Sequence, residues 1–240
     1  MKIALIGYGK MGKIIEKIAI SRGHAITARS SSTLPVEEVD FTNVDVAIEF
    51  TTPELAANHI KHCADQSTPI VVGTTAWGDQ LPFIKDYVIQ NDGSLLYASN
   101  FSIGVNIFFD INKRLAKLMA THPEYSSGIE ETHHTAKIDA PSGTAVSLAN
   151  DILDQNENLT SWVHEENTTP STTSGQIGVT SYRAPNVPGT HKISYDSEID
   201  SIEMTHTAHS REGFGLGAVI AAEWIQHKKG IYTMQDIIKF

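Results

Sequence analysis

Lys2-Ile3-Ala4-Leu5-Ile6-Gly7-Tyr8-Gly9-Lys10-Met11-Gly12 joins a short apolar run to three glycines in the spacing G-x-G-x-x-G. The apolar run predicts a buried strand. A helix is predicted next, because apolar side chains recur at helical spacing as far as Gly23, at Ile14, Ile15, Ile18 and Ala19. A strand, a glycine loop and a helix in this order are the context in which the motif indicates dinucleotide binding.

Each glycine of the loop has its own predicted role. Gly7 permits a tight turn, Gly9 lets the backbone approach a pyrophosphate, and Gly12 lets the helix pack close to the strand. The alternative is an ordinary strand-to-helix turn that binds nothing. We expect the whole loop to contact a dinucleotide cofactor: Gly7, Tyr8, Gly9, Lys10, Met11 and Gly12.

A second stretch carries groups that can move protons: His133-His134-Thr135-Ala136-Lys137-Ile138-Asp139-Ala140-Pro141-Ser142-Gly143-Thr144-Ala145. Pro141 has its φ preset for a first helical turn, and Ser142 and Thr144 can cap free backbone N–H groups. N–H groups at the start of a helix bind anions. An anion-binding turn beside a His/Lys pair therefore predicts a small carboxylate substrate and proton-coupled chemistry.

With Glu130-Glu131-Thr132 before it, this stretch resembles the signature of the 4-hydroxy-tetrahydrodipicolinate reductases, traditionally called dihydrodipicolinate reductases. The family pattern E-x-H-H-x-x-K-x-D-A-P-S-G-T-A is matched at each fixed position. The resemblance extends over essentially the whole chain. Further segments occur in the family's order: Phe50-Thr51-Thr52-Pro53, Gly73-Thr74-Thr75, Ala98-Ser99-Asn100-Phe101-Ser102-Ile103-Gly104-Val105-Asn106 and Thr205-His206.

The resemblance implies a reaction and roles for residues. The family reduces 4-hydroxy-tetrahydrodipicolinate to tetrahydrodipicolinate, on the route to diaminopimelate and lysine, with NADPH or NADH as the source of hydride. It implies that His133 is the catalytic acid/base and Lys137 the proton donor. It also implies a homotetramer assembled through the sheet of the second domain. The substrate-binding residues that it implies are His134, Ser142, Gly143 and Thr144.

Two more segments follow predicted strands, at residues 70–72 and 95–98. They are Gly73-Thr74-Thr75 and Ala98-Ser99-Asn100-Phe101. Ligands of parallel sheets bind beyond the carboxyl ends of the strands. Small residues that simply end a strand are the alternative, and the family resemblance favours contact with the cofactor.

The composition excludes several classes of protein. The net charge is −10, with scattered Lys and Arg, which argues against a nucleic acid or an anionic membrane as partner. Cys63 is the only cysteine, so an intrachain disulfide and a C-x-x-C metal site are excluded. No apolar run approaches the ~20 residues that span a bilayer. We also expect no signal peptide, and therefore a cytoplasmic location.

The pattern of elements predicts an α/β fold in two parts. Strands and helices alternate in the first hundred residues, which predicts a Rossmann-like parallel sheet. We expect a dinucleotide-binding domain of residues 1–102 and 213–240, and an α+β domain of residues 103–212 for substrate binding and oligomerisation, with a mixed or antiparallel sheet. The predicted strands are 2–6, 25–28, 44–50, 70–72, 95–98, 129–136, 176–183, 192–196 and 201–207. The predicted helices include 53–64, 81–89, 105–119 and 213–224, and we expect 156–174 to be a mobile loop.

Two other classes of function fit parts of the sequence. A metal-dependent hydrolase would use the eleven histidines, but no H-E-x-x-H set is present. His206 and His209 would face opposite sides of a strand, so we predict no metal site. A non-catalytic NAD(P)-binding sensor would keep the glycine loop and have no need of the second stretch. For Arg211, contact with the substrate and a surface role both stay open.

The predicted end of the second strand departs from the family. Many members have a longer glycine loop, of the form G-x-x-G-x-M-G, and an acidic residue after this strand. Here the strand runs into Arg29-Ser30-Ser31-Ser32-Thr33, with no carboxylate until Glu37. An acid at this place accepts from the 2′-hydroxyl of NADH, and a nearby cation tolerates the 2′-phosphate of NADPH. We therefore expect both cofactors to be used, with NADPH somewhat favoured.

Overall fold

The computed structural model describes residues 1–238 and divides into two compact units. The first contains Met1–Asn106 and the C-terminal segment from Glu212, and the second is Ile107–Arg211. Each unit has its own sheet and its own buried apolar core. Within residues 1–238, no helix combines the length and the apolar character needed to cross a bilayer.

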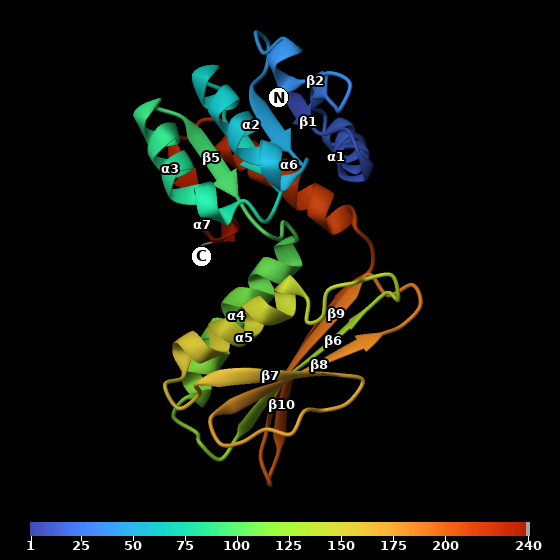
Figure 1. The fold of residues 1–240 in the computed structure, drawn as a ribbon, viewed down its shortest axis with the longest axis vertical. Coiled ribbons are helices and arrows are strands. Elements are labelled where there is room, and N and C mark those ends of the chain that lie inside the picture. Colours follow the sequence, from blue (N-terminus) through green and yellow to red (C-terminus); the bar gives the residue numbers. More distant parts are fainter. Residues whose placement is uncertain (239–240) are drawn as a thin grey trace. The chain divides into compact units, whose positions relative to one another are not determined.

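The first unit is built on a parallel sheet of six strands (Figure 1). Their order is β11-β5-β4-β3-β1-β2, and every neighbouring pair is parallel. The predicted Rossmann-like sheet is confirmed, with one strand more than expected, β11. The strands are β1 (Lys2–Ile6), β2 (Ala25–Ser30), β3 (Val46–Glu49), β4 (Ile70–Val72), β5 (Ser94–Tyr97) and β11 (Gly230–Tyr232).

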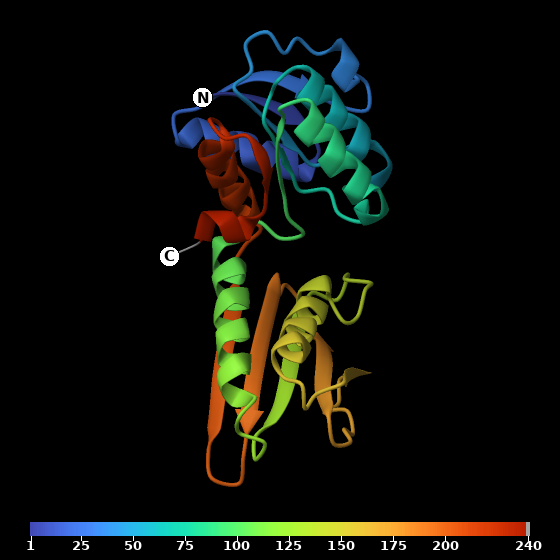
Figure 2. The ribbon, with the colours of Figure 1, turned by 90° about the vertical axis from the view of Figure 1, so that its left-hand side faces the viewer.

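Helices cover both faces of this sheet, which explains why its central strands are continuous apolar runs (Figure 2). On one face Ile15 and Val219 pack against Leu5, and on the other Ile60 and Ile84 join the second cluster of buried side chains. The helices of this unit are α1 (Lys10–Ser21), α2 (Pro53–Asp65), α3 (Leu81–Gln90), α6 (Glu212–Ile225) and α7 (Met234–Ile238), with short 3-10 turns at Val36–Glu38 and Gly78–Gln80.

The second unit is built on a mixed sheet of five strands in the order β10-β9-β6-β8-β7. Neighbours β6, β8 and β7 run parallel, whereas β9 is antiparallel to both β6 and β10. Helices α4 (Ile103–Met119) and α5 (Gly143–Gln155) contribute to one core with this sheet (Figure 1). The strands are β6 (Ser126–His133), β7 (Ser161–Glu166), β8 (Gln176–Arg183), β9 (Gly189–Asp196) and β10 (Ser201–Ala208).

One face of the mixed sheet is apolar along part of its strands and becomes polar further along them. Ile129 on β6 pairs with Ile193 on β9, and both are fully buried in the core that includes α4 and α5. Two residues further along β6, Glu131 pairs with His191 on β9 and with Ser181 on β8. Because side chains two residues apart share a face of a strand, the polar row continues the apolar one.

Two expectations for the catalytic stretch are wrong. Strand β6 ends at His133 rather than at residue 136, because the chain turns there and the Lys137 N–H donates to the carbonyl of His134 at 3.0 Å. Pro141 lies outside the helix rather than in its first turn. Helix α5 begins at Gly143, and the Ser142 hydroxyl caps it by accepting from the Ala145 N–H at 3.2 Å.

The segment 156–174 also differs from the prediction. It contains β7, an edge strand whose half-buried and exposed side chains give little apolar signal. Its backbone pairs with β8 over six residues, from Ser161 opposite Gln176 to Glu166 opposite Ser181. An ordered strand therefore replaces the expected mobile loop in this part of the segment.

Candidate active site

The glycine loop and the ends of β3 and β4 meet at one pocket in the first unit. The pocket has a volume of about 430 Å³. It lies beyond the carboxyl ends of parallel strands, where ligands of such sheets bind. Its lining residues are Gly9, Lys10, Met11, Phe50, Thr51, Pro53, Gly73, Thr74 and Thr75.

The geometry of the loop fits a dinucleotide phosphate. Gly7 has a φ of +96°, and a Cβ there would lie 2.2 Å from the carbonyl oxygen of Phe50. A Cβ on Gly12 would lie 2.3 Å from the carbonyl oxygen of Gly7, so only glycine allows this close packing. A Cβ on Gly9 would meet nothing within 4 Å, so the backbone there is open to a ligand. Helix α1 follows directly, and its free N–H groups suit a pyrophosphate.

The four residues after β5 are placed differently from those after β4. Ala98, Ser99, Asn100 and Phe101 follow the neighbouring strand, but they are not among the lining residues of this pocket. Phe101 is 2% exposed, and its ring lies 5.8 Å from that of Phe50 in the core. Its side chain therefore supports the pocket wall at Phe50, and contact of these four residues with the cofactor stays a prediction.

A buried carboxylate lies beneath the pocket. Glu49, at the end of β3, is 0% exposed and accepts hydrogen bonds from the hydroxyls of Thr51 and Thr74, the latter at 3.0 Å. The buried His59 ring lies beside it, with Nδ1 3.4 Å from the same carboxylate oxygen. Thr74 also accepts from the Thr51 N–H at 2.7 Å. These contacts tie together the two turns that line the pocket.

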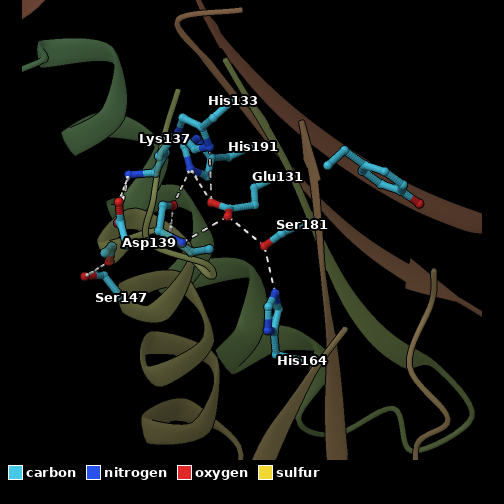
Figure 3. A network of polar contacts seen from close by, with 12 residues as sticks. Glu131, His133, Lys137, Asp139, Ser147, His164, Ser181 and His191 are labelled. Carbon is cyan, nitrogen blue, oxygen red and sulfur yellow. Dashed lines mark hydrogen bonds and ion pairs between the residues drawn. The ribbon is translucent and has the colours of Figure 1, made fainter. Parts of the chain in front are cut away.

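The second unit gathers the catalytic stretch around Glu131 (Figure 3). Glu131 Oε1 accepts from the Ser142 N–H at 3.0 Å and from the Ser181 hydroxyl at 2.7 Å. Glu131 Oε2 lies 3.4 Å from His133 Nδ1 and 3.6 Å from His191 Nε2. The rings of the two histidines meet edge to face at 5.0 Å. One buried carboxylate therefore contacts both the predicted acid/base and the start of α5.

Burial and charge set the protonation of this cluster. Burial lowers the pKa of His133 to about 4, against the opposing charge of Glu131, and the charges of His191, Lys137 and Arg183 lower it further. Burial alone would raise the pKa of Glu131. Contacts from His191, Ser142 and Ser181 outweigh this effect and hold that pKa well below its usual range. His133 is therefore neutral and Glu131 ionised at neutral pH.

Lys137 lies in the turn after β6, where its ammonium donates to both carboxylate oxygens of Asp139 at 2.8 Å. Arg183 braces this turn from β8 by donating to the carbonyl oxygen of Asp139 at 2.7 Å, and its guanidinium lies 3.7 Å from Glu131 Oε1. The Lys137 side chain is 20% exposed, so a ligand can reach it. Two cations, Lys137 from the turn and Arg183 from β8, therefore lie close to the Glu131 cluster.

The start of α5 presents the residues predicted to bind the substrate. Ser142 is buried as the N-cap, and its hydroxyl also lies 3.1 Å from His191 Nε2. Gly143 is exposed and Thr144 half-buried in the first turn, where backbone N–H groups favour an anion. His134 is half-buried just after β6. The six predicted substrate and catalytic residues therefore all lie in one stretch, from the last residue of β6 to the first turn of α5.

Models of known families match both halves of the chain. The model of the N-terminus of dihydrodipicolinate reductase matches residues 1–101, and that of its C-terminus matches residues 104–238. The chain belongs to the dihydrodipicolinate reductase family. Its family, the two-part α/β fold and the class of enzyme expected from the signature, an NAD(P)H-dependent oxidoreductase, are confirmed.

Individual relatives agree with the family models. The 4-hydroxy-tetrahydrodipicolinate reductase of Christiangramia forsetii is 44% identical over 238 residues, which cover 99% of this chain and 98% of that protein. The enzyme of the same name from Rickettsia rickettsii is 36% identical over 96% and 95% of the two chains. The structure of a dipicolinate-bound dihydrodipicolinate reductase from Paenisporosarcina sp. TG-14 shares the fold, with a TM-score of 0.73, 23% identity and 99% coverage of both chains.

Several residues of the cluster were not predicted from the sequence. His191, Ser181 and Arg183 come from β8 and β9, 50 to 60 residues beyond Glu131 along the chain. Glu131 belongs to the signature, but the resemblance implies no role for it. The available signal was a spacing of two residues from buried apolar side chains: Ser181 follows Val179 on β8, and His191 precedes Ile193 on β9.

Among the described residues, Glu131, His133 and His191 also form a group of three potential metal ligands, with their ligand atoms all within 4.8 Å of one another. The carboxylate already accepts two hydrogen bonds and faces the Arg183 guanidinium. At this group the expectation of no metal site stays a prediction. His206 is half-buried on β10, His209 is exposed beyond the strand, and Arg211 is exposed.

Proposed function

We propose that this protein reduces 4-hydroxy-tetrahydrodipicolinate to tetrahydrodipicolinate with NADPH or NADH, through His133 and Lys137. The observation that carries the proposal is the stretch between β6 and α5. It places a buried neutral imidazole, an accessible ammonium and the N-terminus of a helix within thirteen residues. A small dianion that needs a proton fits these three features together.

The first unit is the dinucleotide-binding domain in this proposal, and the second binds the substrate. The glycine loop would hold the cofactor with Gly7, Gly9 and Gly12, supported by Gly73–Thr75 and by Ala98–Phe101. When bound, NAD(P)H supplies a hydride. The open backbone at Gly9 and the N-terminus of α1 support the placement of the pyrophosphate.

The substrate has two carboxylates, and the second unit offers cationic and N–H groups for them. The first turn of α5, with Ser142, Gly143 and Thr144, would bind one carboxylate, and His134 would assist. The likeness in fold to a reductase that binds dipicolinate supports a dicarboxylate of this size. Lys137 would exchange its contact with the exposed Asp139 for one with the substrate.

The reaction replaces a hydroxyl group by hydrogen, so it consumes one hydride and one proton and releases water. In our proposal the Lys137 ammonium donates the proton that the departing oxygen needs. The neutral imidazole of His133 accepts a proton from the substrate ring and returns it. With a pKa of about 4 in the free protein, His133 is unprotonated at neutral pH, as a group that first accepts a proton must be.

We also propose a cytoplasmic homotetramer. A biosynthetic reductase needs the cytoplasmic pool of NAD(P)H. The mixed sheet of the second unit would supply the assembly surface, because α4 and α5 pack in the core on one face of it. Size-exclusion chromatography with light scattering measures the subunit count, and a monomer would contradict this part.

A coupled assay tests the function. The substrate is generated enzymatically, and the loss of nicotinamide absorbance is followed with NADPH and with NADH. His133→Gln should lower kcat by about 10²–10⁴, because that is the usual contribution of general acid–base catalysis. Its affinity for NADPH should stay unchanged. A wild-type protein that binds NAD(P)H without turnover would instead support the alternative, a non-catalytic NAD(P)-binding sensor.

A further inference from the structure

Glu131 takes no part in the reaction proposed above, yet its side chain is 0% exposed. A charge is buried at a large cost unless its surroundings compensate it. We propose, on the basis of the reductase function, that Glu131 is a positioning residue that fixes the imidazole of His133 and the first turn of α5 relative to each other. It would thereby couple proton handling to binding of the substrate carboxylate.

One oxygen of Glu131 holds the start of α5. Oε1 accepts from the backbone N–H of Ser142 at 3.0 Å, and Ser142 in turn caps the helix through the Ala145 N–H. His191, opposite Glu131 on β9, lies 3.1 Å from the Ser142 hydroxyl. The N-cap is thus attached to the sheet through its backbone and its side chain. This attachment fixes where the N–H groups of the first turn point.

The other oxygen faces His133. Glu131 Oε2 and His133 Nδ1 are 3.4 Å apart, and each is buried without a hydrogen-bond partner in the described part of the chain. Buried polar atoms of this kind are rare and call for a partner. A proton on Nδ1 directed at Oε2 satisfies both atoms after a small shift. Glu131 would therefore select the tautomer of His133 that carries its proton on Nδ1.

This tautomer leaves Nε2 free to accept a proton. Gly189, at the start of β9, keeps that nitrogen accessible, because a Cβ at this position would lie 3.1 Å from His133 Nε2. The His133 ring, fixed by Glu131, and the absence of a side chain at Gly189 act together. They leave the lone pair of Nε2 free on the side of Gly189, as a base in the proposed reaction requires.

The charge of Glu131 also adjusts the affinity of His133 for a proton. Burial lowers the pKa of His133, Glu131 raises it, and His191, Lys137 and Arg183 lower it. Of these four groups, Glu131 is the one that favours the imidazolium. Removing its charge should therefore lower the pKa of His133 still further and make the ring a weaker base. A purely structural carboxylate near α5 would not have this effect.

The first experiment needs no variant of Glu131. The ¹⁵N shifts of the histidine rings in the wild-type protein report the tautomer, with the signals of His133 identified by their loss in His133→Gln. We expect the Nδ1–H form at pH 7. An Nε2–H form would overturn the proposal. This measurement does not depend on turnover, so it also holds if the proposed reaction proves wrong.

The second experiment compares Glu131→Gln with Glu130→Gln. The two residues are neighbours on β6, but Glu130 is 46% exposed and pairs with Lys192 on the other face. We expect Glu131→Gln to raise the KM of the substrate and to lower kcat about tenfold or more, with the ~10²–10⁴-fold of general acid–base catalysis as the upper range. The KM of NADPH should stay within about twofold, and Glu130→Gln should match the wild type.

The pH profile separates positioning from simple structural support. In Glu131→Gln the acidic limb of kcat/KM should move to lower pH, and Glu130→Gln should leave it in place. A folded Glu131→Gln protein with an unmoved limb and with kcat and KM within about threefold of wild type would overturn the proposal. If Glu131→Gln fails to fold, the tautomer of the wild-type protein decides. If the wild type lacks turnover, the proposed function fails. Binding of pyridine-2,6-dicarboxylate is then compared between Glu131→Gln and Glu130→Gln in place of the kinetics.

Discussion

Lys137 donates to both carboxylate oxygens of Asp139 at 2.8 Å, and this ion pair is half open to solvent, with the aspartate side chain 63% exposed. Such a pair contributes only about 0–1 kcal/mol to stability. A substrate carboxylate can therefore displace Asp139 at small cost. In our proposal the pair keeps the ammonium in place beside the Glu131 cluster until a dianion binds.

Replacement of Lys137 by Met should keep the fold and remove the proton donor. We expect kcat to fall by about 10²–10⁴, with the affinity for NADPH unchanged. Lys113→Met is the matched control, because it breaks an ion pair with Asp151 elsewhere in the second unit. Steady-state kinetics and thermal melting of both variants check the prediction. Equal kcat values in the two variants would show that Lys137 is not the proton donor.

The pH dependence should reveal the neutral His133. Its pKa is lowered to about 4, chiefly by burial. If the free enzyme needs the neutral ring, kcat/KM stays high on acidification past pH 6.5 and falls only near pH 4. The unfolded chain binds the proton near pH 6.5, so the folding free energy contributed by this group is lost as the pH falls from about 6.5 to about 4. A kinetic limb near pH 6.5 that His133→Gln abolishes would contradict this assignment.

The first turn of α5 can be tested with a single hydroxyl. Thr144→Val keeps the shape and removes a donor, and a hydrogen bond to a charged group contributes roughly 1.5–3 kcal/mol. The KM of the substrate should rise by a factor of about 10–150, and the affinity for NADPH should stay the same. Ser147→Ala is the control, because that hydroxyl donates to the carbonyl of Gly143 within the helix. An unchanged KM in Thr144→Val would place the carboxylate elsewhere.

Substitution by alanine should have different effects at two glycines of the loop. Gly9→Ala adds a Cβ that meets no protein atom within 4 Å, so stability should be kept while the KM of NADPH rises about tenfold or more. Gly12→Ala places a Cβ 2.3 Å from the Gly7 carbonyl, so it should lower Tm by several degrees, about 1–3 kcal/mol of stability.

Gly78→Ala is the control for both, since a Cβ there also meets nothing within 4 Å and the residue lies outside the pocket. Its melting temperature and its KM for NADPH should both match the wild type. A loss of stability in Gly9→Ala would contradict the open backbone at this position. Unchanged binding of NADPH by that variant would contradict the placement of the pyrophosphate.

The elements that the sequence predicts well are those that local pattern determines. β1, the glycine loop and α1 follow from a buried apolar run, a turn that only glycine allows, and helical spacing. Competing local signals explain the error at Pro141. Ser142 makes the stronger helix start because its hydroxyl satisfies a backbone N–H, and proline before it then lies outside.

The cluster around Glu131 could not be predicted in this way. Its members on β8 and β9 come together through the register in which these strands pair with β6. The sequence of one strand does not determine that register. The edge strand β7 was missed for a related reason, since few of its side chains are buried. The signature supplied the candidate reacting residues, whereas the polar groups around them are apparent only once the strands pair in the sheet.

Arg29 and Glu16 form an ion pair at the end of β2, and the Arg29 guanidinium lies 5.5 Å from the centre of the Tyr8 ring. The Tyr8 hydroxyl donates to the same carboxylate. A cation that could face a 2′-phosphate, Arg29, is therefore present beside the glycine loop, but the Glu16 carboxylate partly neutralises its charge. This arrangement favours the use of both cofactors, with NADPH somewhat preferred.

Variants of the pair should shift this preference in opposite directions. Glu16→Gln frees the guanidinium, so the ratio of kcat/KM for NADPH over NADH should rise about tenfold, and more at low salt because the new contact is a charge pair. Arg29→Ala should lower the ratio by a similar factor, about 1.4 kcal/mol. Lys17→Ala is the control, since Lys17 pairs on α1 with a residue of α6 and is 82% exposed. A wild-type preference for NADH of about tenfold, or a ratio that both variants leave unchanged, would show that Arg29 does not contact the cofactor.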